Sequence, residues 1–239
     1  MKIVSKIIGG FAFATTLAFG TLNTFNASAQ ENNDRNVGSF SSVDISGGMD
    51  VFLTEGSTES VKVEVKGIEA EKVLTEVKGE ALKISIKNGS SWSWGKGVEI
   101  KVYVTYRKLK AISSSGSSDI ICNSKLKNES FEIALSGSGD LKASLETANL
   151  DVSVSGSADI DLEGKADVQN IAISGSGNFK GRNLEGKEVK VRISSSGDAT
   201  VWANESIEAK VSGSGDVTYK GNPSKEVSKV SGSGTIKKG

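Results

Sequence analysis

The sequence Ser-Gly-Ser-Gly-Asp-Leu at residues 136–141 decides the fold, because variants of it recur through the C-terminal half of the chain. The seven copies, each called a phrase below, read SSGSSDI, SGSGDL, SGSADI, SGSGNF, SSSGDA, SGSGDV and SGSGTI. Their acidic or equivalent positions are Asp119, Asp140, Asp159, Asn178, Asp198, Asp216 and Thr235, at steps of 21, 19, 19, 20, 18 and 19 residues. Repeats of this length are supersecondary units that stack on one another. The spacing therefore predicts an all-β fold, a parallel β-solenoid with about 18–21 residues per coil.

Apolar residues recur at fixed odd distances from the acidic position of each phrase. Side chains of a strand alternate between its two faces, so odd and even positions lie on opposite faces. The positions seven and five before the acidic residue are apolar in six of the seven copies, and the position after it is apolar in all seven, as in Ile133, Leu135 and Leu141. The positions four and two before it are serine in every copy. We expect the odd positions to face the core and the serines to face water.

Small residues occupy the two odd positions inside the phrase, such as Gly137 and Gly139. A small residue at an inward position indicates that the backbone runs close to the core, so each phrase is predicted to be a tight strand bend. A hairpin meander could also use glycine. Apolar columns in phase at one coil length favour parallel stacking instead, with rungs about 4.8 Å apart.

The N-terminus has the parts of an export signal. Lys2 and Lys6 precede an apolar stretch at residues 7–22, and Ala27-Ser28-Ala29 is an A-x-A cleavage site. Residues 1–29 are therefore predicted to be a signal peptide, with an uncleaved anchor as the alternative. No second hydrophobic stretch follows, so we expect a mature chain without a transmembrane segment. It would be exported through the inner membrane and be periplasmic, on the cell surface or secreted.

The remaining chain divides into a linker and one domain. Polar residues 30–36 are predicted to be a flexible linker, and residues 37–239 a single β-solenoid domain. Within it, residues 37–110 form irregular N-terminal coils and residues 111–239 the repeat coils. Ile45 to Val51 reads as a degenerate first copy of the phrase, which places both parts in one stack. Residues 67–78 are interpreted as a loop or cap.

Composition excludes several functions. The chain has 29 basic and 29 acidic residues, so nothing in its net charge indicates a nucleic-acid partner. It has no histidine, which removes the commonest general base and metal ligand, and no cofactor, metal or catalytic residue is predicted. The single cysteine, Cys122, shares an inward column and is interpreted as a buried core thiol.

The acidic positions form an outward ladder whose members are Asp119, Asp140, Asp159, Asn178, Asp198 and Asp216. Stacked carboxylates about 4.8 Å apart suggest one alternative, a carbohydrate-active β-helix enzyme. However, the ladder tolerates Asn178 and ends in Thr235, which indicates turn chemistry. Calcium solenoids repeat every nine residues, so this spacing does not match them. We interpret the ladder as structural.

Two tryptophans are the candidate binding residues. Trp92 and Trp94 lie in the polar, glycine-containing segment 88–95, where indole rings could stack on a sugar or a partner. The alternative is that they close one end of the core.

The combination of Phe40-x-x-Val43-x-Ile45-x-Gly47, the alternating strands up to Val104 and the seven phrases resembles the head GIN domain family. This family was formerly a domain of unknown function and is named for auto-transporter adhesins. The resemblance implies a right-handed parallel β-helix outside the bacterial inner membrane. The hypothesis from sequence is an exported, non-catalytic binding or adhesion module for a glycan or cell-envelope component. The sequence indicates neither the ligand nor the oligomeric state.

Overall fold

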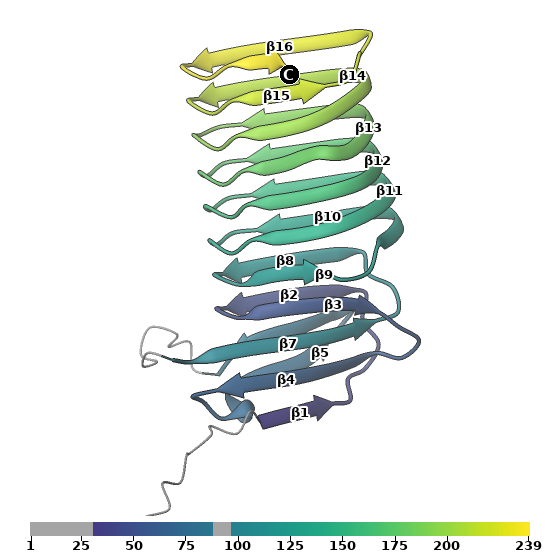
Figure 1. The fold of residues 1–239 in the computed structure, drawn as a ribbon, viewed down its shortest axis with the longest axis vertical. Helices are drawn as coiled ribbons and strands as arrows, with labels where there is room; N and C mark the ends of the chain where they lie inside the picture. Colours follow the sequence, from purple (N-terminus) through teal and green to yellow (C-terminus); the bar gives the residue numbers. More distant parts are fainter. Residues whose placement is uncertain (1–30, 88–96) are drawn as a thin grey trace, which may run out of the picture.

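The chain folds into a tall stack of β-coils (Figure 1). The structure is a computed structural model and describes residues 31–87 and 97–239. Within these residues, 17 strands belong to one hydrogen-bonded sheet, and the helical content is one short 3₁₀ turn, η1 (Ala70–Lys72). The predicted all-β solenoid is confirmed.

Each repeat coil contributes to two layers that face each other across the core. The first layer holds the residues that lead into the phrase, and the second layer holds those that follow it. The long strands begin in the second layer, turn, and end in the first. The strands of this region are β8 (Ala111–Gly116), β9 (Asp119–Cys122), β10 (Leu126–Leu135), β11 (Leu141–Val154), β12 (Ile160–Ile173), β13 (Phe179–Ile193), β14 (Ala199–Gly213), β15 (Val217–Lys220), β16 (Lys225–Gly232) and β17 (Ile236–Lys238).

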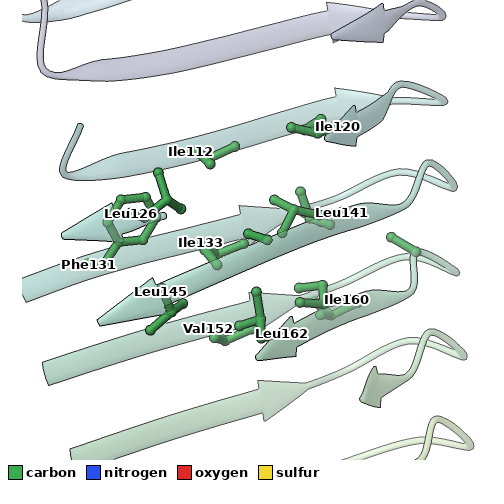
Figure 2. Packing of buried hydrophobic residues seen from close by; sticks show 14 of the residues in the cluster. Ile112, Ile120, Leu126, Phe131, Ile133, Leu141, Leu145, Val152, Ile160 and Leu162 are labelled. Atoms are coloured by element: carbon green, nitrogen blue, oxygen red, sulfur yellow. The ribbon is translucent and has the colours of Figure 1, made fainter. Parts of the chain in front are cut away.

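The core consists of the predicted apolar columns. In the first layer Ile133 pairs in register with Val152, and in the second Leu141 pairs with Ile160. These four side chains are at most 3% exposed, and Figure 2 shows them in the interior between the strands. Because identical positions stack in register, each coil extends the same core.

The first coil along the sequence does not lie at the end of the stack. β2 (Ser42–Gly47) and β3 (Asp50–Glu55) lie between β8–β9 on one side and β6 (Ala81–Ile86) with β7 (Glu99–Tyr106) on the other. All of these pairings are parallel. Gly47 aligns with Gly116 and Asp50 with Asp119, so Ile45 to Val51 is a copy of the phrase, as predicted.

Antiparallel strands close the N-terminal end of the stack. β4 (Ser60–Lys66) pairs with β7, and β5 (Val73–Lys78) pairs with β6. η1 and β5 lie in residues 67–78, the segment predicted to be a loop or cap. The segment does lie at the end of the stack, but the sequence did not predict that part of it forms a strand. The alternation of β5 is weak in the sequence because the outward position Leu74 is apolar and the inward position Thr75 is polar.

The prediction of a flexible linker at residues 30–36 is wrong. Residues 31–35 form β1 (Glu31–Arg35), which pairs antiparallel with β4. The Arg35 guanidinium donates hydrogen bonds to the carbonyl oxygens of Ala70 (2.7 Å) and Val73 and to the Thr75 hydroxyl (3.0 Å). Backbone pairing and the hydrogen bonds of Arg35 thus order a segment that has almost no apolar side chains. The linker was predicted from this polar composition, which does not report on either interaction.

The last coil is polar on its core side. Glu226, Ser228 and Lys238 occupy inward positions that are apolar in the coils before it, and β16 is exposed along its length. The Tyr219 hydroxyl donates to Glu226 Oε2 at 2.7 Å. Val230 continues the apolar column of Val211 and is 43% exposed, so the polar side chains reduce the apolar surface at this end of the stack without removing it.

Within the phrase, the glycine three residues before the ladder position lies directly above the backbone of the previous coil. A Cβ on Gly137 would lie 1.6 Å from the carbonyl oxygen of Gly116, and one on Gly175 would lie 1.9 Å from that of Gly156. The sequence predicted a bend too close to the core for a side chain. The group that excludes a side chain is instead the backbone carbonyl of the equivalent glycine in the previous coil.

Candidate functional site

The acidic ladder binds backbone amides rather than projecting freely. Oδ1 of each member accepts a hydrogen bond from the backbone N–H of the next member, one coil further on. The donor–acceptor pairs are Asp140–Asp119 (3.0 Å), Asp159–Asp140 (3.1 Å), Asn178–Asp159 (3.1 Å), Asp198–Asn178 (3.0 Å), Asp216–Asp198 (2.8 Å) and Thr235–Asp216 (2.8 Å). An amide oxygen serves this purpose as well as a carboxylate, which explains why asparagine is found in the ladder.

Hydrogen bonding also favours the ionised form of two ladder carboxylates, those of Asp159 and Asp216. Burial opposes ionisation of Asp159, but hydrogen bonds from Lys180 and Asn178 outweigh it, and the pKa of Asp159 lies below its usual value. Hydrogen bonds from the hydroxyl and backbone of Thr235 lower the pKa of Asp216. A general acid would need the opposite shift.

We expect Asp140→Ala to lower the free energy of unfolding by about 1–2 kcal/mol, because the N–H of Asp159 loses its acceptor. Asp140→Asn keeps Oδ1 and should change stability by less than about 0.5 kcal/mol. Asp161→Ala, an exposed carboxylate two residues after the ladder, is the matched control. Urea denaturation measures all three. Equal losses for the alanine and asparagine variants would show that the ladder bond does not stabilise the fold.

The other residues singled out from sequence have local roles or lie outside the described residues. Cys122 is half-buried beside the core, and desolvation raises its pKa to about 12, so its thiol stays protonated. Lys220 Nζ lies 3.7 Å from the centroid of the Trp202 ring, a cation–π pair between adjacent coils. Trp92 and Trp94 lie outside the described residues.

A trough of about 470 Å³ runs across four coils on the outer surface of the first layer. Its floor consists of small outward side chains on β2, β8, β10 and β11, with Lys83 of β6 at one end. The outward residues include Asp44, Ser113, Ala134, Ser136, Ser153 and Ser155. The Ser113 hydroxyl donates to the Asp44 carboxylate. The trough exists because these columns lack large side chains over several consecutive rungs.

The trough combines hydroxyl groups with methyl and methylene surface. A serine hydroxyl both donates and accepts hydrogen bonds, so the floor can pair with either kind of group. Because the floor belongs to in-register strands above a packed core, it is rigid. This arrangement suits an extended ligand with alternating hydroxyl and C–H surface, such as a polysaccharide. The trough was not predicted from the sequence. Its signal there is the small residue found six positions before each of Asp119, Asp140 and Asp159.

The second layer has a smaller groove and an aromatic pair. The groove, about 370 Å³, lies beside Ile121, Lys142 and Asp161. Nearby, the rings of Phe52 and Tyr103 stack with centroids 5.0 Å apart and planes at 16°. The two rings cover each other's facing surfaces and are half-buried, so the pair stabilises adjacent coils and offers little open ring face to a sugar.

Metal-binding clusters and membrane-spanning helices are both absent from the described part of the chain. No group of three or more Cys, Asp or Glu side chains there converges on a point where a metal could bind. Residues 31–87 and 97–239 also contain no helix with the length and apolarity needed to cross a membrane.

Comparison with known proteins finds several similar solved structures. A structure described as a putative adhesin from Bacteroides fragilis is 26% identical, with a TM-score of 0.83 over 89% of this chain and 98% of that one. One described as a "Putative lipid binding protein" from Parabacteroides distasonis is 24% identical, with a TM-score of 0.72 over 89% and 98%. A putative adhesin from Parabacteroides merdae is 21% identical, with a TM-score of 0.70 over 89% and 97%. The last two show similarity of fold alone.

A search of curated proteins found no match to this chain. A family model described as "Putative auto-transporter adhesin, head GIN domain" matches residues 39–223.

Proposed function

The chain belongs to the head GIN domain family, and on that basis we propose that it is a non-catalytic binding module that acts in adhesion at the bacterial cell envelope. The observation that carries this proposal is the trough on the outer face of the first layer. It is a rigid, extended surface with hydroxyl groups at regular intervals, and such a surface recognises a linear ligand without changing it. The description of the Bacteroides fragilis structure as a putative adhesin supports the same class of function.

The proposal includes export. The predicted signal peptide at residues 1–29 lies outside the described residues and stays a prediction. A location in the periplasm, on the cell surface or outside the cell suits a protein whose ligand is a glycan or an envelope component.

We further propose that the protein is not an enzyme. The sequence left open a carbohydrate-active enzyme that uses the outward carboxylates. Each ladder oxygen named above already accepts a backbone hydrogen bond, and the pKa values of Asp159 and Asp216 are lowered. Both observations favour a role in the fold. We therefore expect no cleavage of any polysaccharide that the protein binds.

The trough is tested by filling it. Ala134→Tyr places a large side chain on the floor, and we expect it to reduce binding to immobilised envelope polysaccharides and glycans by about ten-fold, because the ligand loses contact over several rungs. Thr200→Tyr, on the outer face of the second layer, is the matched control and should bind as the wild type does. Surface plasmon resonance with the mature protein gives both affinities. An unchanged affinity for Ala134→Tyr would rule out the trough as the contact surface.

Trp92 and Trp94 remain a second predicted contact. Ser85 aligns with Ser46 in the first layer, and Lys101 aligns with Asp50 in the second. The chain therefore takes 16 positions to pass from the first layer to the second here, against four in the neighbouring coil. The described residues on either side of the segment belong to β6 and β7, and Lys83 of β6 lines the end of the trough. Trp92→Ala combined with Trp94→Ala should weaken binding about ten-fold, since aromatic anchors dominate interface energy.

Thermal denaturation provides the control for the tryptophan pair. If the double variant melts several degrees lower and its binding follows only the folded fraction, the tryptophans close the core and are not a contact.

A further inference from the structure

A column of cations continues the trough toward the C-terminal end of the stack. The outward column that supplies Ala134 and Ser153 to the trough runs in register through Ala172 and then through Arg192, Lys210 and Lys229. Lys190 lies two residues before Arg192, on the same face of β13. We call Lys190, Arg192, Lys210 and Lys229 the cationic column; all four are exposed.

In two other columns of the stack, charges of opposite sign alternate from rung to rung. Lys127, Glu146, Lys165 and Glu185 pair in that order, and so do Lys142, Asp161 and Lys180. Like charges on directly paired positions are destabilising. The three consecutive cations at Arg192, Lys210 and Lys229 therefore lack the alternating counter-charges of those two columns.

Only part of this repulsion is relieved by the protein itself. Glu208 pairs with Lys210 at 2.5 Å, aligns with Lys190 on the adjacent coil and interacts at longer range with Arg192. Glu188 also lies on this face. Within residues 31–87 and 97–239, Lys190, Arg192 and Lys229 have no ion pair. A bound polyanion would supply the missing counter-charges.

The neighbouring column favours a polysaccharide over a nucleic acid. Exposed Ser194, Ser212 and Ser231 lie two residues from the three stacked cations, and they offer hydroxyl groups along the full length of the cationic column. The outward side chains of β13, β14 and β16 on this face include no aromatic residue, whereas proteins that bind single-stranded nucleic acids stack bases on aromatic rings. Toward the N-terminal end, the paired acids Glu132 and Asp151 would repel a polyanion, so they mark the limit of the anionic part of the site.

We propose that the cationic column and its serines bind a linear anionic polysaccharide that lies along the stack. Arg192, Lys190 and Lys229 would pair with its carboxylate or sulfate groups, because charged hydrogen bonds of this kind are the stronger ones. Uncharged sugars of the same polymer would continue into the trough. The inference rests on the proposed binding function and specifies the charge of the ligand. The net charge of the chain does not indicate this cationic surface, because the 29 basic and 29 acidic residues cancel over the whole sequence.

The test compares two charge-reversed double variants of the full mature chain. Arg192→Glu with Lys229→Glu alters the cationic column. Lys108→Glu with Lys237→Glu makes the same change in total charge at exposed positions off this face. The probes are dextran sulfate, polygalacturonate, neutral dextran of similar length and a single-stranded DNA of matched charge. Isothermal titration calorimetry at two salt concentrations measures the affinities.

We expect wild-type protein to bind both polyanions, with affinity that falls as salt rises, and to bind neutral dextran more weakly. The Arg192/Lys229 variant should lose at least ten-fold in affinity for the polyanions, and the Lys108/Lys237 variant less than three-fold. Equal losses in the two variants, or wild-type protein that binds neither polyanion, would overturn the proposal. So would single-stranded DNA that binds as tightly as the polysaccharides at equal charge. Protein that binds neutral glycans through the trough but no polyanion would contradict this inference alone and leave the proposed function standing.

Discussion

Replacing Gly175 by valine is expected to lower the free energy of unfolding by about 3 kcal/mol or more, at the upper end of what overpacking costs. The new Cβ would lie 1.9 Å from the carbonyl oxygen of Gly156 and 2.8 Å from its carbonyl carbon. That oxygen accepts the backbone hydrogen bond of Ser176 at 2.9 Å. The coils must therefore separate locally, and the ladder of hydrogen bonds through the phrase is disturbed.

The adjacent residue provides the control for this prediction. Ser176 is exposed, and Ser176→Val should change stability by less than about 0.5 kcal/mol. Urea denaturation monitored by circular dichroism gives both midpoints. Equal midpoints would contradict the close approach of neighbouring coils at the glycine.

One natural phrase already shows how a side chain at this position changes the bend. Ser195 takes the place of glycine in residues 194–198. There the N–H of Gly197 donates to the carbonyl of Gly175, whereas in the preceding phrase both Ser176 and Gly177 donate to the carbonyl of Gly156. A Cβ is thus accommodated where the hydrogen bonding of the phrase is altered.

Phe179→Ala is expected to destabilise the protein by about 3–5 kcal/mol, the range for truncating a fully buried phenylalanine. Phe179 is 1% exposed, and its column holds the smaller Leu141, Ile160 and Ala199 in neighbouring coils. The extra volume fits because Gly181, two residues later, has no side chain. A Cβ on Gly181 would lie 2.4 Å from Cε1 of the Phe179 ring.

A double-mutant cycle tests this pairing of a large and a small residue. Gly181→Ala alone should cost about 1–3 kcal/mol through overpacking. Combined with Phe179→Leu, which frees space, it should cost clearly less than the sum of the two single changes, because residues in contact are not additive. Strict additivity in urea denaturation would show that the ring does not occupy the space beside Gly181.

The repeat region was predictable because its determinants are local and recur. Alternation with period two assigns Ile133 and Leu141 to the core and Ser136 to solvent, and seven phrases repeat that assignment at one spacing. The same alignment placed Ala134 and Arg192 in one outward column, although the trough and the cationic column were not recognised from it. The chemistry of the ladder was also suggested by sequence, since asparagine can replace aspartate only where an oxygen acceptor suffices.

Contacts between strands distant in the sequence could not be predicted in this way. The sequence alone determined the coil length, the columns of the core and the facing of each phrase, because these depend on the alternation of neighbouring residues. Only the tertiary structure placed β2 and β3 between coils that come later in the chain, ordered β1 through Arg35, and brought Lys83 and Asp44 to one end of the trough. The reason is physical: any coil with the same apolar columns can stack on any other, so the order of coils depends on the whole assembly and not on the pattern within each coil.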